Sequence, residues 1–431
     1  MAFLDGRIVT VDHTRVAADQ SDFPILIKGI YPYLATAANG GNVQNSNGYD
    51  IVFSTDDAGV GRLDWETVFY DPATGSVEYH VKVPTLSASV DTSFYMKFGD
   101  SSITTDQSNK TAVWSSNFKM VQHLPNGTAL TIVDSTSNAN NGTPSGAVTA
   151  TTGFIDGAAN FSNTLDAYID VGDTASLTDL ALAPATFSFW LKLTGSGGID
   201  NTILSKTDDY VSAGWTIWSE DQNTIELIVV RPTSAAIWWQ YLPPGAWHRI
   251  VITYSGTPTA TGDALLYVNG SPTAWNFIAG SGVQGSDAGN PFNIGGDPLY
   301  TGAVSALGGI LDEIRVAGVQ RSASWILTEY NTQVSPPTFY SLVNPQPLPP
   351  GLTLDPATGI ISGIPTVAGT YFYTVTVTDA NGFTATVTCP IIITASGPPP
   401  PPPPPEICIL VPPGESPTLI AYNEPNERDG S

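Results

Sequence analysis

Charged side chains are scarce in this chain, and basic ones are the scarcest. Only 13% of its 431 residues are Asp, Glu, Lys or Arg, and 39 acidic against 15 basic residues give a formal net charge of −24. Nucleic-acid phosphates and anionic membrane surfaces both attract a basic face. The balance therefore excludes nucleic acid as a partner, and it leaves Ser, Thr, Asn and Gly to cover most of the surface.

Long hydrophobic runs are also missing, so the sequence predicts no membrane insertion. The features of a secretory signal peptide are absent, because residues 1–6 lead directly into a strand-like segment. We therefore expect either that a leader was removed or that the protein leaves its cell by another route. Assembly into a phage particle followed by lysis is one such route.

Cysteine is almost absent, since Cys389 and Cys408 are the only two. Eight consecutive prolines, 398–405, lie between them, and a polyproline II rod of that length spans about 25 Å. A disulfide needs Cα atoms within about 7 Å of each other. The sequence therefore predicts two unpaired thiols, which suit assembly in a reducing cytoplasm.

Short alternating segments separated by turn residues fill most of the chain, which is typical of all-β proteins. The first stretch covers residues 1–115. Its clearest strand alternates apolar Val77, Tyr79, Val81 and Val83 with polar residues, so it predicts one core face and one wet face. An Asp-Pro-Ala-Thr-Gly turn precedes this strand, with Pro and Gly supplying the backbone angles that a hairpin needs.

Four segments of this first stretch resemble the DUF2341 domain, namely 11–16, 22–26, 70–75 and 81–86. The resemblance implies a β-sandwich. It implies no chemistry, because the family has no assigned activity.

The second stretch, residues 116–335, places strand-like segments at regular spacing, as a sandwich requires. Its motifs resemble, in content and order, the concanavalin A-like, laminin-G-type jelly roll. Those motifs are His123-Leu124, 134–142, 157–161, 267–270 and 311–315. We also expect Ser324 to cap a short helix over 325–330 before two prolines end the domain.

The third stretch, residues 336–396, repeats the Asp-Pro-Ala-Thr-Gly turn at 355–359 and continues into an alternating strand at 369–379. It resembles the Ig-like domain of the He_PIG type, which is found in repeated surface proteins. Together the three stretches predict an all-β, multi-domain chain of β-sandwiches: an N-terminal sandwich, a jelly roll and an Ig-like sandwich.

The last stretch, residues 397–431, combines the polyproline spacer with a tail too short to fold alone. The tail mixes apolar residues with Pro, Glu and Asn. We expect it to anchor the chain to neighbouring virion or surface-assembly subunits and to make the protein a homo-oligomer. The residues predicted for this role are Cys408, Ile409, Leu410 and Val411.

Catalytic patterns are weak throughout. The histidines are scattered, and no zinc-ligand spacing, nucleophile elbow or phosphate-binding loop is present. Glycoside hydrolysis needs two carboxyls about 5–9 Å apart. The candidate acids offer no same-face pair along a strand, namely Glu220, Asp221 and Glu226 in one cluster and Asp312 and Glu313 in the other. The sequence therefore predicts a non-enzymatic protein.

A structural Ca²⁺ is the chemical site that the sequence favours. Calcium takes six to eight oxygen ligands, and the loop 134–142 is rich in Asp, Asn, Ser and Thr. In laminin-G-type domains an acid on the closing strand often helps to hold Ca²⁺, and the resemblance puts Asp312 in that place. The predicted ligands are Asp134, Asn138 and Asp312; the alternative is that Asp134 and Asn138 only form local turns.

Carbohydrate is the ligand that the aromatic residues favour, because flat rings stack on sugar C–H faces. The segment 238–241 is the densest aromatic cluster, and alternation puts Trp239 and Tyr241 on one face and Trp238 on the other. The predicted sugar-binding residues are Trp238, Trp239, Tyr241 and Trp275, with Trp215 and Trp218 as further candidates. The alternative is that most of these tryptophans pack the core.

Together these observations predict a phage virion protein. It would be a fibre or decoration subunit that displays a host-surface or glycan-binding jelly roll. A secreted or cell-surface bacterial adhesin is the alternative, because the same domain string occurs there. An accessory module of a glycan hydrolase is a third interpretation.

Overall fold

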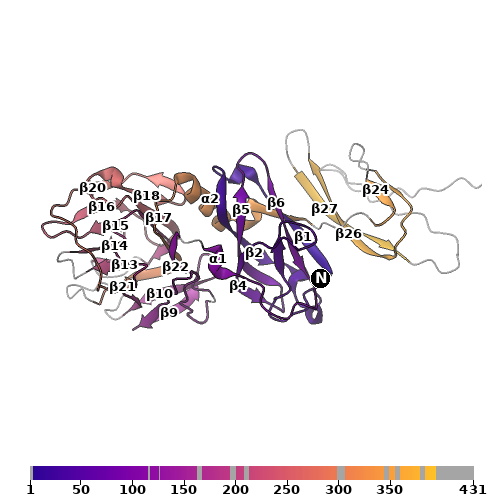
Figure 1. Ribbon diagram of the computed structural model, residues 1–431, viewed down its shortest axis with the longest axis horizontal. Helices are drawn as coiled ribbons and strands as arrows, with labels where there is room; N and C mark the ends of the chain where they lie inside the picture. The colour runs from indigo at the N-terminus through magenta and orange to yellow at the C-terminus, as the bar shows by residue number, and fades with distance from the viewer. Residues whose placement is uncertain are drawn as a thin grey trace, which may run out of the picture. The chain divides into compact units, whose positions relative to one another are not determined.

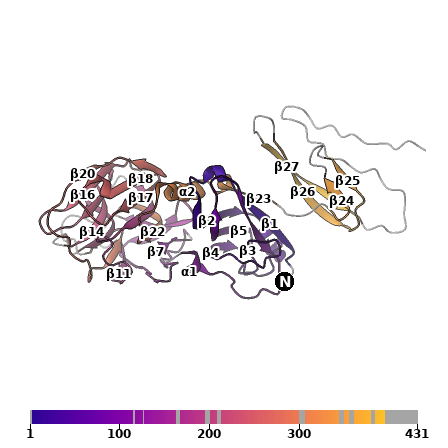
Figure 2. The same ribbon diagram turned by 45° about the horizontal axis from the view of Figure 1, so that its top comes forward.

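A computed structural model of the chain is almost entirely β, as the sequence predicts (Figures 1 and 2). It forms two compact units, Met1–Leu342 and Val343–Ser431, which we describe separately. No helix among the described residues is long and apolar enough to cross a membrane. The structure describes residues 3–114, 117–125, 127–162, 167–194, 200–207, 213–298, 306–343, 349–354, 360–378 and 384–394.

The first sandwich packs a four-stranded sheet on a three-stranded one. The larger sheet has the order β23 (Tyr340–Val343), β1 (Asp5–Val11), β6 (Thr92–Phe98) and β3 (Val52–Ser54). The smaller sheet has the order β2 (Gln20–Ile30), β5 (Ser76–Leu86) and β4 (Trp65–Asp71), with the short helix α1 (Lys110–Val113) beside β4.

Strand β5 shows both a success and a failure of the alternation rule. Val77, Tyr79 and Val81 are buried in the core of the first sandwich, as predicted. The opposite face of β5 is not exposed to solvent, because Glu78 is only 2% and His80 only 1% exposed. A neighbouring domain covers this face, and a pattern within one strand carries no information about such a contact.

The second sandwich is the jelly roll, built from two large sheets. We call inner sheet the one with the order β19 (Ser271–Thr273), β18 (Ala264–Val268), β17 (His248–Tyr254), β12 (Ala185–Leu193), β22 (Gly308–Ala317), β10 (Gly157–Ser162) and β9 (Val148–Thr152), with β7 (Phe118–Gln122) also paired to β22. We call outer sheet the one with the order β20 (Asn276–Ile278), β16 (Ala236–Tyr241), β15 (Thr224–Val229), β14 (Gly214–Glu220), β13 (Asp200–Thr207), β21 (Phe292–Ile294), β11 (Tyr168–Gly172) and β8 (Thr143–Ser145).

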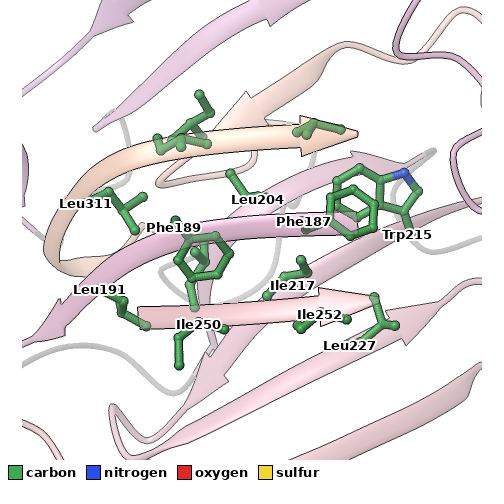
Figure 3. Close-up of a cluster of buried hydrophobic side chains, with 14 of the residues drawn as sticks. Phe187, Phe189, Leu191, Leu204, Trp215, Ile217, Leu227, Ile250, Ile252 and Leu311 are labelled. Atoms are coloured by element: carbon green, nitrogen blue, oxygen red, sulfur yellow. The ribbon is translucent and has the colours of Figure 1, made fainter. Parts of the chain in front are cut away.

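The core of the jelly roll lies between these two sheets. Phe187 and Phe189 of β12 point from the inner sheet toward Trp215 and Ile217 of the outer sheet (Figure 3). All four side chains are at most 1% exposed. Burying each such side chain contributes roughly 1.5–3 kcal/mol. The inward-facing side chains of the alternating strands therefore hold the two sheets together.

A helix packs between the first sandwich and the jelly roll (Figure 1). This helix, α2 (Ala323–Val334), begins earlier than predicted, because Ser322 rather than Ser324 caps it by accepting from the backbone N–H of Trp325. On one side the Trp325 ring contacts Phe23 of β2, with ring centroids 4.7 Å apart. On the other side Ile326 packs in a cluster with residues of β17 and β18.

The end of the first unit departs from the expected boundary at 335/336. After α2 the short helix α3 (Pro336–Phe339) leads into β23, which adds to the sheet of the first sandwich beside β1. The chain thus returns to the first sandwich after completing the jelly roll. Phe339 and Tyr340 are buried in the core of that sandwich.

The second unit contains two strand pairs among its described residues. β24 (Leu352–Leu354) pairs with β25 (Ile361–Gly363), and β26 (Gly369–Thr378) pairs antiparallel with β27 (Thr384–Ile393) along its whole length. Cys389 lies opposite Tyr373 in this register. The predicted anchoring residues Cys408, Ile409, Leu410 and Val411 lie outside the described residues.

Candidate carbohydrate-binding face

The outer sheet turns an aromatic surface away from the core. On β16 the side chain of Trp238 is fully buried, whereas Tyr241 is 61% exposed and Trp239 is partly exposed. Alternation along the strand separates these residues as the sequence predicts. Trp239 and Tyr241 therefore point outward together.

Strand pairing extends this surface into a row across the sheet. Trp218 on β14 lies opposite Glu226 on β15, and Glu226 lies opposite Trp239 on β16. Trp239 in turn lies opposite Asn276 on β20. We call this set, together with Tyr241, the aromatic face. It combines planar rings with one carboxylate and one amide.

The carboxylate of the aromatic face has a fixed position. The indole Nε1 of Trp218 donates a hydrogen bond of 2.7 Å to Glu226 Oε2. Glu226 is only 6% exposed, so its carboxylate lies largely buried between Trp218 and Trp239. The sequence marked Trp218 as a candidate, but Glu226 and Asn276 join it only through register between strands.

Glu220 also lies on the outward side of this sheet. It is two residues after Trp218 on β14 and is exposed, while Glu226 is on the adjacent strand. The sequence shows no same-face pair of acids along one strand, but neighbouring strands place these two acids on one face. Glycoside hydrolysis requires such a pair, so catalysis must be tested here.

Two predicted sugar-binding residues lie in the core instead. Trp238 Nε1 donates to the carbonyl of Thr261, and Trp275 Nε1 donates to the carbonyl of Ala264. Their ring centroids are 6.2 Å apart. Trp238 therefore serves packing. Trp275, 9% exposed, also lines a cleft of about 300 Å³ beside β18 and β19.

The predicted calcium ligands make other interactions. The carboxylate of Asp134 accepts hydrogen bonds from the backbone N–H groups of Val121, Thr136 and Asn140 and from the Thr136 hydroxyl. Asn138 is exposed, and its amide donates to the carbonyl of Lys119. These are the local turn interactions that we gave as the alternative to calcium binding by Asp134 and Asn138.

Asp312, the third predicted ligand, is almost fully buried. Its Oδ2 accepts from the backbone N–H groups of Phe154 and Ile155, at 2.8 and 2.9 Å. Burial, together with the neighbouring Glu313 carboxylate, holds the pKa of Asp312 well above its usual range. In the described residues, groups of three or more potential ligands from His, Cys, Asp and Glu include neither Asp134 nor Asp312. Calcium binding therefore stays a prediction.

Comparison with known families agrees with two of the three resemblances. Residues 161–327 match the model of the concanavalin A-like lectin/glucanases superfamily. Residues 315–394 match the model described as "Putative Ig domain". The chain thus contains a concanavalin A-like domain and an Ig-like domain. The resemblance of the first stretch to DUF2341 stays a prediction.

Similar solved structures include two toxin domains. The botulinum neurotoxin serotype G binding domain is 13% identical, with a TM-score of 0.37 and 50% of each chain covered. The binding domain of Paraclostridial Mosquitocidal Protein 1 is 15% identical, with a TM-score of 0.36, covering 50% of this chain and 52% of that one. The chain therefore spans about half of each structure, and this likeness assigns it no ligand. No curated protein matches the chain.

Proposed function

We propose that this protein is a non-enzymatic structural and adhesive protein whose jelly roll binds carbohydrate through the aromatic face. The observation that supports the proposal most is the row Trp218–Glu226–Trp239–Asn276 on the outward side of the outer sheet. Aromatic residues that remain outward on a sheet give up burial in the core, and such surfaces mark interaction sites.

The chemistry of the aromatic face suits a sugar. Indole and phenol rings present flat apolar surfaces to the C–H faces of a pyranose, and a few fixed polar groups set its orientation. Glu226 supplies acceptor oxygens for hydroxyl groups, and the Asn276 amide both donates and accepts. The hydrogen bond from Trp218 holds the carboxylate in place before a ligand arrives.

A glycan array probed with the wild-type protein and with Trp239→Ala tests the proposal. We expect Trp239→Ala to weaken binding to any glycan hit about 30-fold, which corresponds to the roughly 2 kcal/mol of a buried aromatic contact. Tyr95→Ala is the matched control, because Tyr95 is a partly exposed aromatic on β6 of the first sandwich. Absence of binding on the array, or equal losses for both variants, would count against the aromatic face.

Release of sugar from a bound polysaccharide would overturn the non-enzymatic part of the proposal. In that case Glu220→Gln and Glu226→Gln should each abolish release, since glycoside hydrolysis needs both carboxyls. Binding without release over long incubation supports an adhesive role.

We also propose that the protein is a phage fibre or decoration subunit, with a bacterial surface adhesin as the alternative. The proposal is supported by the domain string and by the polyproline spacer between two cysteines that we expect to be unpaired. Native mass of the full chain beside a 1–396 truncation tests the anchoring tail. A defined oligomer that only the full chain forms supports it, and identical masses speak against it.

A further inference from the structure

A cluster of ionisable side chains is buried where the first sandwich meets the jelly roll. Glu78 and His80 are two residues apart on β5 and therefore point from the same face of that strand. This is the face whose burial the alternation rule missed. The first sandwich thus contributes a carboxylate and an imidazole to the junction.

The jelly roll contributes a matching pair from two adjacent strands. His123 directly follows β7, and Glu313 lies on β22. The two side chains are 5% and 0% exposed, and His123 Nδ1 lies 2.6 Å from Glu313 Oε1. Both groups are sealed from solvent, so their charges are compensated inside the protein, where Arg315 Nη2 also donates a hydrogen bond to Glu313 Oε2.

A distortion of β22 aims Glu313 at the junction. The pairing of β22 with β12 shifts register between Ser188 and Trp190, and Glu313 has a positive φ of 50°. Without this bulge, alternation would send Asp312 and Glu313 to opposite faces of the sheet. Such strain in a non-glycine residue persists only where the surroundings hold it, and it concentrates at functional sites.

A second layer of residues orients this cluster. Glu66 accepts hydrogen bonds from Trp114 Nε1 at 2.6 Å and from the hydroxyl of Ser135, and it lies 3.2 Å from His123 Nε2. That contact occupies one nitrogen of His123 and turns the other toward Glu313. A carboxylate behind an imidazole is the usual support of a metal-binding histidine.

His80 is the unexplained member of the cluster. Neither of its ring nitrogens has a hydrogen-bond partner among the described residues, although His80 is only 1% exposed. Its ring stacks on His123, with centroids 4.6 Å apart and an interplanar angle of 19°. A buried imidazole without a partner is costly, and an ion is one of the standard explanations.

We propose that Glu78, His80, His123 and Glu313 form a binding site for a divalent transition metal, zinc by its ligand chemistry, that links the first sandwich to the jelly roll. One ligand atom from each residue lies within 4.8 Å of all the others. Two imidazoles and two carboxylates suit tetrahedral Zn²⁺, whereas Ca²⁺ prefers oxygen ligands only. Glu66 acts as a positioning residue for His123.

Metal binding requires a small rearrangement. The His80 ring must turn out of its stack with His123, and no hydrogen bond from the described part of the chain holds the ring there. A metal between His123 Nδ1 and Glu313 Oε1 replaces the proton that those atoms otherwise share, and that proton is released.

Titration of the EDTA-treated full chain with zinc, followed by calorimetry and metal analysis, tests the site. We expect one zinc per chain and a rise in Tm of about 4 °C when free zinc is about 100 times the Kd. Cobalt should give a visible absorption band from the same nitrogen and oxygen ligands. A wild-type chain that binds no stoichiometric zinc overturns the proposal, whatever the variants do.

His80→Phe is the sharpest variant, because a phenyl ring keeps the stack but cannot bind metal. We expect it to fold, to lose the cobalt band and to bind zinc more than about 100-fold more weakly, since even supporting residues are worth 10–100-fold. His13→Phe is the control, because His13 belongs to the other potential ligand group, the accessible Asp12–His13–Asp91. Loss of zinc binding in His13→Phe, with zinc binding retained in His80→Phe, would refute the buried site. If His80→Phe fails to fold, Glu78→Gln repeats the test.

Discussion

Removing the charge of Glu329 should loosen the attachment of α2 to the jelly roll. Glu329 is 4% exposed, and its two oxygens bind two buried arginines. Oε2 lies 3.1 Å from Arg249 of β17, and Oε1 lies 2.9 Å from Arg315 of β22. Glu329→Gln keeps the shape of the side chain but leaves two buried guanidinium groups with less compensating charge.

Breaking a buried ion pair from one side costs about 3–5 kcal/mol. For a cooperative unit the size of Met1–Leu342 the entropy of unfolding is roughly 0.7 kcal/mol per degree, so the Tm should fall by about 4–7 °C. Thermal and urea unfolding measure the change. Glu220→Gln, the same substitution at an exposed site on β14, is the control and should shift the Tm by less than about 1 °C.

The difference in stability between the wild type and Glu329→Gln depends on pH, and the sign of this dependence can be derived. Burial alone would raise the pKa of Glu329, but Arg249 and Arg315, with Arg321 nearby, outweigh it and lower the pKa below the ordinary value of 4.5. A carboxyl with a lowered pKa stabilises the folded state above its unfolded pKa and loses that effect as pH falls through the folded pKa. The gap between wild type and Glu329→Gln should therefore be full above pH 4.5 and shrink below it. A gap that is negligible at pH 7, or that widens in acid, would refute the reasoning.

Two further predictions concern the jelly roll. Gly295→Ala places a Cβ about 2.0 Å from the Phe161 ring. Gly245 has a similar positive φ, but a Cβ there meets no atom of the described residues within 4 Å. We expect both substitutions to cost about 1 kcal/mol for the backbone, and only Gly295→Ala to cost a further 1–3 kcal/mol, roughly, for overpacking, as measured by urea unfolding. If Asp134 helps to bind calcium, EGTA should lower the Tm of the wild type but not of Asp134→Ala, and a calcium titration without heat or Tm change contradicts the site.

The sequence predicts well those features that depend on one strand and its core. Alternation places Val77 inward on β5 and separates Trp238 from Trp239 on β16, because each strand faces a hydrophobic interior on one side only. The order of motifs identifies the jelly roll and the Ig-like segment. These features are local, so the amino-acid pattern is sufficient.

Prediction fails where a second domain or a neighbouring strand supplies the environment. Glu78 and His80 look like a solvated face until the jelly roll covers them. Alternation predicts that Glu313 and Asp312 point to opposite faces of the sheet, but a bulge in β22 turns Glu313 toward the junction. Glu226 and Trp218 meet only through the register of two strands. None of these contacts leaves a periodic signal within one strand, because the partner lies in another domain or on another strand, or a bulge interrupts the alternation.

The two sheets of the jelly roll differ in what covers them, and this difference connects the junction with the proposed function. The inner sheet presents Arg249, Arg315 and Trp190 to α2, where Trp190 donates to Gln333 and the arginines bind Glu329. That face is therefore committed to holding the first sandwich. The outer sheet has no such partner among the described residues at Trp239 and Tyr241, and these two side chains remain outward. If the junction fixes the jelly roll, substitutions at Glu329 should change stability without changing glycan affinity of the folded protein, whereas Trp239→Ala should do the reverse. Parallel loss of both properties in either variant would show that the two faces are coupled.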